Sequence, residues 1–163
     1  MTTLAHFHGY GPWIGRPDQY HAEYLRRPGT LPQEWRDERT KQRKSLDMEA
    51  YLPFDKRAVP PMRTGHWLMR RPDPLARQTW GEPKEAAEWL ARMYEGDPPV
   101  PLPDGRPIHP GLSAKVEYAA AALTNGTDVV WMHYLPGDYM FNACVVVCPN
   151  RHLPDLPCPL PPS

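Results

Sequence analysis

The sequence has few of the residues and motifs that form familiar active sites. It contains three serines, Ser45, Ser113 and Ser163, and none of them lies in a G-x-S-x-G motif. A P-loop and an H-E-x-x-H motif are also missing, and the N-terminal glycines do not form a G-x-G-x-x-G fingerprint because Ile14 occupies the third position. The sequence therefore contains no recognised motif for serine hydrolysis, nucleotide binding or zinc peptidase chemistry.

Long apolar runs and many cysteines are missing as well. Only nine residues separate Asp128 from Asp138 in the most apolar part of the chain, whereas a membrane span needs about 18. The first residues, MTTLAHFHGYG, lack the basic and apolar regions of a secretion signal. Three cysteines are too few, and odd in number, for a disulfide framework. We therefore expect no membrane partner, and we expect the protein in the reducing cytoplasm.

The chain has no net charge, but its two halves differ. Residues 1–75 carry 13 Lys and Arg against 9 Asp and Glu, and residues 76–163 carry 6 against 10. A charge of +4 spread over 75 residues is well below the concentrated basic surface of most nucleic-acid binders. Nucleic acid is therefore not favoured as a partner, and we expect a protein or a small molecule instead.

Proline is abundant and divides the chain. Six of the 23 prolines lie between residues 96 and 110, and six more lie between residues 149 and 162. Proline lacks the backbone N–H and fixes φ, so neither stretch can form a helix or an inner strand. The pattern predicts one domain over residues 1–149, with a proline-rich loop at 97–110, followed by a proline-rich tail at 150–163.

The tail offers one candidate partner-binding surface. Pro154 and Pro157 have the P-x-x-P spacing of polyproline-II ligands. The alternative is that the tail packs on its own domain or has no fixed structure.

The clearest secondary structure follows residue 80. Apolar residues recur at helical spacing over residues 83–96 and 112–124, and Asn125-Gly126 supplies a C-terminal cap for the second helix. Two runs rich in Val, Trp, Tyr and Phe flank a Pro-Gly-Asp turn, which predicts a hairpin with strands at about 128–135 and 139–148.

A hairpin needs further strands for stability. Residues 65–71 and residues 4–10 are the best candidates for them. The sequence therefore predicts an α+β fold, with a mostly antiparallel sheet of three to four strands around a central hairpin at about 128–148, packed by two to three helices.

Residues 30–50 predict a charged, weakly packed helix. Between Trp35 and Leu46 there is no large apolar residue. A solvated helix with internal ion pairs is one interpretation, and an arm that binds phosphate or a protein is the other. The partner-binding candidates on this arm are Arg36, Arg39, Arg43 and Lys44.

The C-terminal cysteines raise the question of a metal site. Cys144 and Cys148 share one strand face but are about 13 Å apart, too far to bind one zinc ion together. Cys148, His152 and Cys158 remain as weak zinc candidates, with no fourth ligand identified. The simpler interpretation is that the thiols behave as small apolar residues, and we expect no cofactor, with zinc as the alternative.

The histidines supply the remaining catalytic candidates. His6 and His8 are two residues apart and share one face of a strand, a pattern also found in metal hydrolases. With His133 and nearby tyrosines they are the weak candidates for an unfamiliar, metal-assisted site. The absence of catalytic motifs nevertheless favours a noncatalytic interaction or accessory protein. An enzyme, or phosphate or nucleic-acid binding through residues 36–44, are the alternatives.

Overall fold

A four-stranded antiparallel sheet forms the centre of the protein, described here from a computed structural model. The structure describes residues 4–29, 33–34, 37–38 and 48–160. The strand order is β2-β1-β4-β3. The strands are β1 (His6–Gly15), β2 (Thr79–Trp80), β3 (Val129–Leu135) and β4 (Tyr139–Cys148). This arrangement confirms the predicted α+β fold, and it includes the strand expected near residues 4–10. Of the hairpin predicted to be central, only β4 lies inside the sheet, whereas β3 forms an edge because β1 pairs with the other side of β4.

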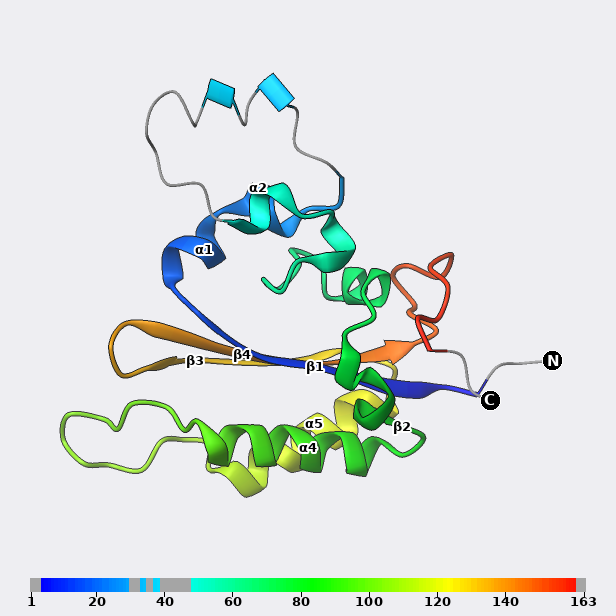
Figure 1. Ribbon diagram of the computed structural model, residues 1–163. Helices are drawn as coiled ribbons and strands as arrows, with labels where there is room; N and C mark the ends of the chain where they lie inside the picture. Colours follow the sequence, from blue (N-terminus) through cyan, green and yellow to red (C-terminus); the bar gives the residue numbers. More distant parts are fainter. Residues whose placement is uncertain (1–3, 30–32, 35–36, 39–47, 161–163) are drawn as a thin grey trace.

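Helices cover one face of the sheet and irregular turns cover the other (Figure 1). The first face carries α4 (Pro83–Gly96) and α5 (Leu112–Thr124), the two helices predicted from apolar periodicity. The second face carries α1 (Pro17–His21), α2 (Glu23–Arg26) and 3-10 turns. The 3-10 turns are η1 (Met48–Tyr51), η2 (Phe54–Lys56), η3 (Thr64–Met69) and η4 (Asp73–Gln78). Three layers result, with the sheet in the middle.

Strand β4 is buried on both faces because it lies between β1 and β3 and between the two outer layers. Its side chains alternate, so that Phe141, Ala143, Val145 and Val147 pack with the helices. Cys144, Val146 and Cys148 pack on the opposite side. This double burial explains why residues 139–148 are almost continuously apolar.

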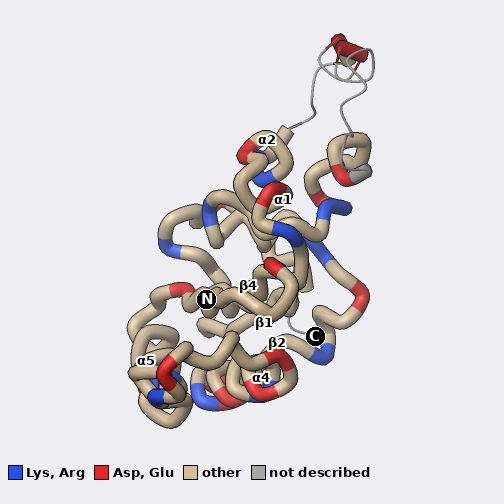
Figure 2. Tube along the Cα trace, turned by 90° about the vertical axis from the view of Figure 1, so that its left-hand side faces the viewer, with Lys and Arg blue, Asp and Glu red and all other residues tan. Residues whose placement is uncertain are grey.

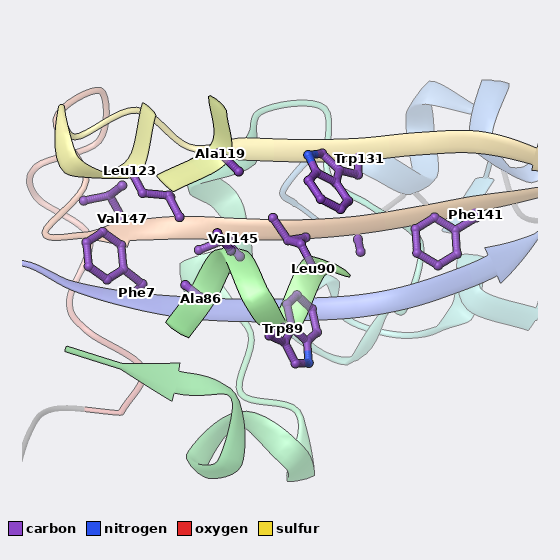
Figure 3. Packing of buried hydrophobic residues seen from close by; sticks show 12 residues of the cluster. Phe7, Ala86, Trp89, Leu90, Ala119, Leu123, Trp131, Phe141, Val145 and Val147 are labelled. Carbon is purple, nitrogen blue, oxygen red and sulfur yellow. The ribbon is translucent and has the colours of Figure 1, made fainter. Parts of the chain in front are cut away.

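The helix-side core joins α4 and α5 to the sheet. Trp89 and Leu90 of α4 meet Phe7 of β1 and Trp131 of β3 (Figure 3). Figure 2 shows that α4 and α5 also carry charged residues of both signs. The apolar residues of each helix pack in this core, as the periodicity of the sequence predicts.

The opposite layer differs from the sequence prediction at residues 65–71, which do not form a strand. They belong largely to η3, in which Trp67 and Leu68 are buried side by side. The outer edge of β1 is already paired with β2. In addition, Arg70 turns its guanidinium to the carbonyl oxygens of Phe54 and Val59 at 3.1 and 2.5 Å. A short apolar run is compatible with a buried turn as well as with a strand, so the sequence pattern of residues 65–71 wrongly predicted a strand.

A charged helix was predicted for residues 30–50, and most of this segment lies outside the described residues.

Within the described part of the chain, no helix is long and apolar enough to cross a bilayer.

Candidate metal centre

Strand pairing brings two histidines and one cysteine together at one end of the sheet. His6 of β1 lies directly opposite Cys148 of β4, and His8 lies opposite Val146. Because side chains alternate along a strand, His6, His8 and Cys148 all point to the face away from α4 and α5. Directly opposed and diagonal residues on one sheet face are close enough to interact.

The tail supplies a fourth residue, Cys158. After Pro149 ends the strand, the chain turns back, with backbone hydrogen bonds from Leu153 N–H to the Asn150 carbonyl and from Leu156 N–H to the Leu153 carbonyl. Leu156 and Cys158 then pack against the Tyr10 and Cys148 side of the sheet. The tail is therefore folded on its own domain up to residue 160, which is the alternative left open by the sequence.

Asp128 anchors the start of this tail. Its carboxylate accepts hydrogen bonds from the Asn150 side-chain amide at 3.0 and 3.1 Å and from the Val147 N–H at 2.9 Å. It also accepts one from the Thr64 hydroxyl at 2.7 Å. Asn150 in turn accepts from the His152 N–H at 3.1 Å. These bonds hold the turn that returns Cys158 to the sheet.

Four potential ligand atoms converge as a result. The Nε2 atoms of His6 and His8 are 3.1 Å apart, and each lies 3.3 Å from Cys158 Sγ. The ligand atoms of His6, His8, Cys148 and Cys158 all lie within 4.8 Å of one another. His8 and Cys148 are buried, whereas His6 and Cys158 are partly exposed. The cluster thus sits at the boundary between the core and the surface.

Hydrogen bonds orient both imidazole rings. His8 Nδ1 lies 2.8 Å from Thr79 Oγ1, and the Thr79 hydroxyl donates to the Leu75 carbonyl at 2.7 Å. The threonine oxygen therefore accepts from the His8 Nδ1–H. His6 Nδ1 faces the Leu4 carbonyl at 3.4 Å, and a carbonyl can only accept. Both rings consequently turn an unprotonated Nε2 toward the cluster, as metal-binding histidines do.

Burial favours the uncharged forms of His8 and Cys148, the two buried members of the cluster. It lowers the pKa of His8 to about 4, with a smaller contribution from His6. It raises the pKa of Cys148 to about 12, and Cys158 adds to this increase. Neutral imidazole is the form of histidine that binds metals, and a bound cation would displace the thiol protons.

The donor set fits zinc. In a tetrahedral zinc site, Zn–N bonds of about 2.05 Å and Zn–S bonds of about 2.3 Å place neighbouring ligand atoms roughly 3.3 to 3.8 Å apart. The contacts among His6, His8 and Cys158 are 3.1 to 3.3 Å, and all four ligand atoms lie within 4.8 Å of one another. Imidazole and thiolate donors suit zinc and disfavour Mg²⁺ and Ca²⁺, which prefer oxygen. The separations between the ligand atoms are close to those of a tetrahedral zinc site.

Other candidate residues lie elsewhere. Cys144 is fully buried beside Tyr10 and is not part of the four-residue group. His152 is exposed and outside the group. His133 stacks on Phe141 at 4.3 Å, and its Nε2–H donates to the Asp97 carbonyl at 2.6 Å on the helix side of the sheet. The structure does not bring His133 together with His6 and His8.

The partner-binding candidates fall into two groups. Pro154 and Pro157 are exposed on the folded tail. Arg36, Arg39, Arg43 and Lys44 lie outside the described residues.

The sequence pointed to the four residues of the cluster in two separate groups. His6 and His8 were grouped by the H-x-H spacing, and Cys148 and Cys158 by the C-terminal cysteine pattern. The sequence does not show that the first strand pairs with the last, and this pairing brings the two groups of residues together. Searches of protein-family models, curated proteins and solved structures return no match for this chain, so its geometry carries the functional argument.

Proposed function

We propose that this protein is a zinc-binding accessory protein in which His6, His8, Cys148 and Cys158 hold one structural ion. The observation that carries the proposal is the convergence of four nitrogen and sulfur ligand atoms within 4.8 Å. The hydrogen bonds to the histidine Nδ1 atoms support it, because they present the metal-binding nitrogen of each ring. The ion would join the first strand, the last strand and the tail.

A structural role follows from the number of ligands. Structural zinc sites have four protein ligands, whereas catalytic sites keep one position for water or substrate. Two histidines and two cysteines fill a tetrahedral ion and leave no such position. The ion itself would then take no part in catalysis. In this proposal the protein is noncatalytic and acts by binding a protein or small-molecule partner. A reducing cytoplasm suits this role, because the ligand thiols must stay reduced.

Metal content and coordination test the proposal. The protein, purified without a histidine tag under reducing conditions, should contain one zinc per chain by elemental analysis. Replacement by Co²⁺ should give the intense visible bands of tetrahedral cobalt and a thiolate-to-cobalt charge-transfer band in the near ultraviolet. Protein that retains neither ion would contradict the proposal.

Matched variants assign the ligands. Cys158→Ser and His6→Ala should lose the stoichiometric zinc, because each removes one of the four ligands. Cys144→Ala and His152→Ala should retain it, because both residues lie outside the cluster. Equal metal loss in the control variants would show that the ion is bound elsewhere.

A metal-assisted enzyme is the second candidate, favoured by the partial exposure of Cys158. If Cys158 gave way to water, the ion would have three protein ligands and an open position. X-ray absorption of the zinc protein distinguishes the two roles by the number of sulfur ligands. Two sulfurs support the structural role, and one sulfur with an added oxygen supports the enzyme.

A further inference from the structure

Buried arginines organise the irregular layer on the second face of the sheet. Arg57 and Arg70 are each 2% exposed. Arg57 Nε donates to the carbonyls of Glu49 and Leu52 at 3.1 and 3.0 Å. Arg70 donates to the carbonyls of Phe54 and Val59, and its guanidinium lies over the Phe54 ring, 4.4 Å from the centroid. These arginines therefore bind the chain through carbonyl oxygens, which carry no full negative charge.

Each guanidinium has one nitrogen left over. Nη2 of Arg57 and Nη2 of Arg70 are buried and have no hydrogen-bond partner among the described residues. A buried donor without an acceptor costs about 1 to 3 kcal/mol, and more when it is charged. Native structures rarely retain such groups unless a water, an ion or a ligand satisfies them. Two such donors in the same layer indicate a missing acceptor.

Both arginines line one cleft between β1 and the 3-10 turns. The cleft has a volume of about 410 Å³, which is within the range of small-molecule sites. Trp13 of β1 and Trp67 of η3 also line it, together with Pro12 of β1 and with Pro72 and Pro74 at the start of η4. Tyr10 stacks on Trp67, with ring centroids 4.9 Å apart, and this fixes one wall. The cleft thus combines flat apolar walls with two buried cations.

The charge around the cleft is predominantly positive. The cationic lining residues are Lys56, Arg57, Arg70 and Arg71, and the acidic ones are Asp55 and Asp73. Glu49 is not one of the lining residues, and its carboxylate accepts from the Ala58 N–H and the Val59 N–H. Burial lowers the pKa of Arg70 to about 10, and Glu49 only partly opposes this effect. Arginine nevertheless remains charged at neutral pH, so the cleft holds buried positive charge.

We propose that this cleft binds a small ligand that carries an oxyanion, a carboxylate or a phosphate, on a flat apolar body. The oxyanion accepts hydrogen bonds from the guanidinium groups of Arg57 and Arg70, which line the cleft and retain unused donors, since guanidinium groups match the geometry of carboxylate and phosphate oxygens. The apolar body lies between the aromatic walls at Trp13 and Trp67. This site is on the same face of the sheet as the metal cluster but uses none of its four ligands, so it stands independently of the zinc proposal.

Four small probes test the two parts of the ligand. Benzoate and phenyl phosphate carry the oxyanion on an aromatic ring, benzyl alcohol carries the ring without the charge, and inorganic phosphate carries the charge without the ring. Calorimetric titration should give benzoate or phenyl phosphate an affinity about tenfold or more above that of benzyl alcohol, the equivalent of one charge-assisted hydrogen bond. The stronger of the two anions identifies the ligand as a carboxylate or a phosphate. Inorganic phosphate should bind more weakly than phenyl phosphate.

Variants place the binding in this cleft without removing the buried arginines. Ala58 is exposed and lines the cleft, and Ala58→Trp fills it while its backbone bond to Glu49 remains. This variant should lower the affinity for the better anion by about tenfold or more. Ala121→Trp, at an exposed position of α5 on the other side of the sheet, is the control and should bind like the wild type.

A charge reversal keeps the test decisive if Ala58→Trp does not fold. Arg71→Glu reverses an exposed cation of the cleft and should lower the affinity several-fold. Arg77→Glu reverses an exposed cation that is not part of the lining and should have a smaller effect. Equal binding of benzyl alcohol and both anions would overturn the proposal. So would anion binding that is the same in the cleft variants and in their controls.

Discussion

Zinc should raise the thermal stability of this protein in proportion to the logarithm of its free concentration. The ion can bind tightly only to the folded chain, because His8 and Cys148 are separated by about 140 residues in sequence and meet only when β1 pairs with β4. A ligand that binds the folded state alone adds RT ln(1 + [L]/Kd) to the free energy of unfolding. The dependence of Tm on free zinc concentration, measured in the wild type and in ligand variants, therefore tests the proposed site.

The expected magnitude follows from this relation. At a free zinc concentration 100 times Kd the added stability is about 2.7 kcal/mol, and at 1,000 times Kd it is about 4.1 kcal/mol. For a domain of this size, 1 kcal/mol corresponds to about 3 °C in Tm. The Tm should therefore rise by roughly 8 °C at the first concentration, and by about 4 °C for each further tenfold increase.

The assay is thermal unfolding followed by circular dichroism in zinc buffers of defined free concentration, with a reducing agent present. Cys158→Ser should require a higher zinc concentration for the same rise in Tm, because only three ligands remain. Cys144→Ala should start from its own Tm in chelator and then rise with the wild-type slope, since Cys144 is outside the cluster. A wild-type Tm that does not depend on zinc, or an identical response in Cys158→Ser, would refute the proposed centre.

Three further predictions concern the fold around the centre. Phe141→Ala should lower the free energy of unfolding in urea by about 3 to 5 kcal/mol, because this ring is fully buried between the sheet and the helices, whereas the exposed Tyr139→Ala should change it by less than about 1 kcal/mol. Asp128→Ala should cost about 2 to 4 kcal/mol and weaken zinc binding, because it leaves the buried donors of Asn150 and Val147 without their acceptor; unchanged zinc affinity would show that the tail does not depend on this anchor. Burial lowers the pKa of His133 below its usual value of about 6.5, so its stabilising contribution is complete above that pH and is lost as the pH falls. The wild type should accordingly lose more stability than His133→Gln between about pH 7.5 and pH 5 in urea unfolding, and equal losses would contradict this assignment.

Local patterns predicted the helix side of this protein well. The 3.6-residue periodicity and the end signals located α4 and α5 to within a residue or two, and the Val-rich and aromatic runs around the turn at residues 136–138 located β3 and β4. These elements could be predicted because their signals are contained within about fifteen consecutive residues. The apolar run in β4 also indicated burial on both faces.

The opposite layer could not be predicted in this way. Its 3-10 turns have no apolar periodicity of their own. Buried arginines hold them by donating to backbone carbonyl oxygens, and because every residue has a carbonyl, the sequence does not reveal these partners. Arg57 and Arg70 look like surface residues in the sequence, because arginine is rarely buried in proteins. The proposed anion-binding cleft therefore had no signal in the sequence.

The sequence by itself determined the residue types of the proposed metal centre: an H-x-H pair on one face of the first strand, a cysteine at the end of the last, and another cysteine in the tail. Only the tertiary structure decided that these four residues meet, and that Cys144, His152 and His133 stay apart from them. The physical reason is the range of the interactions. Side-chain alternation along a strand is a local property, whereas the pairing of β1 with β4 and the return of the tail through Asn150 and Asp128 depend on contacts between residues far apart in the chain.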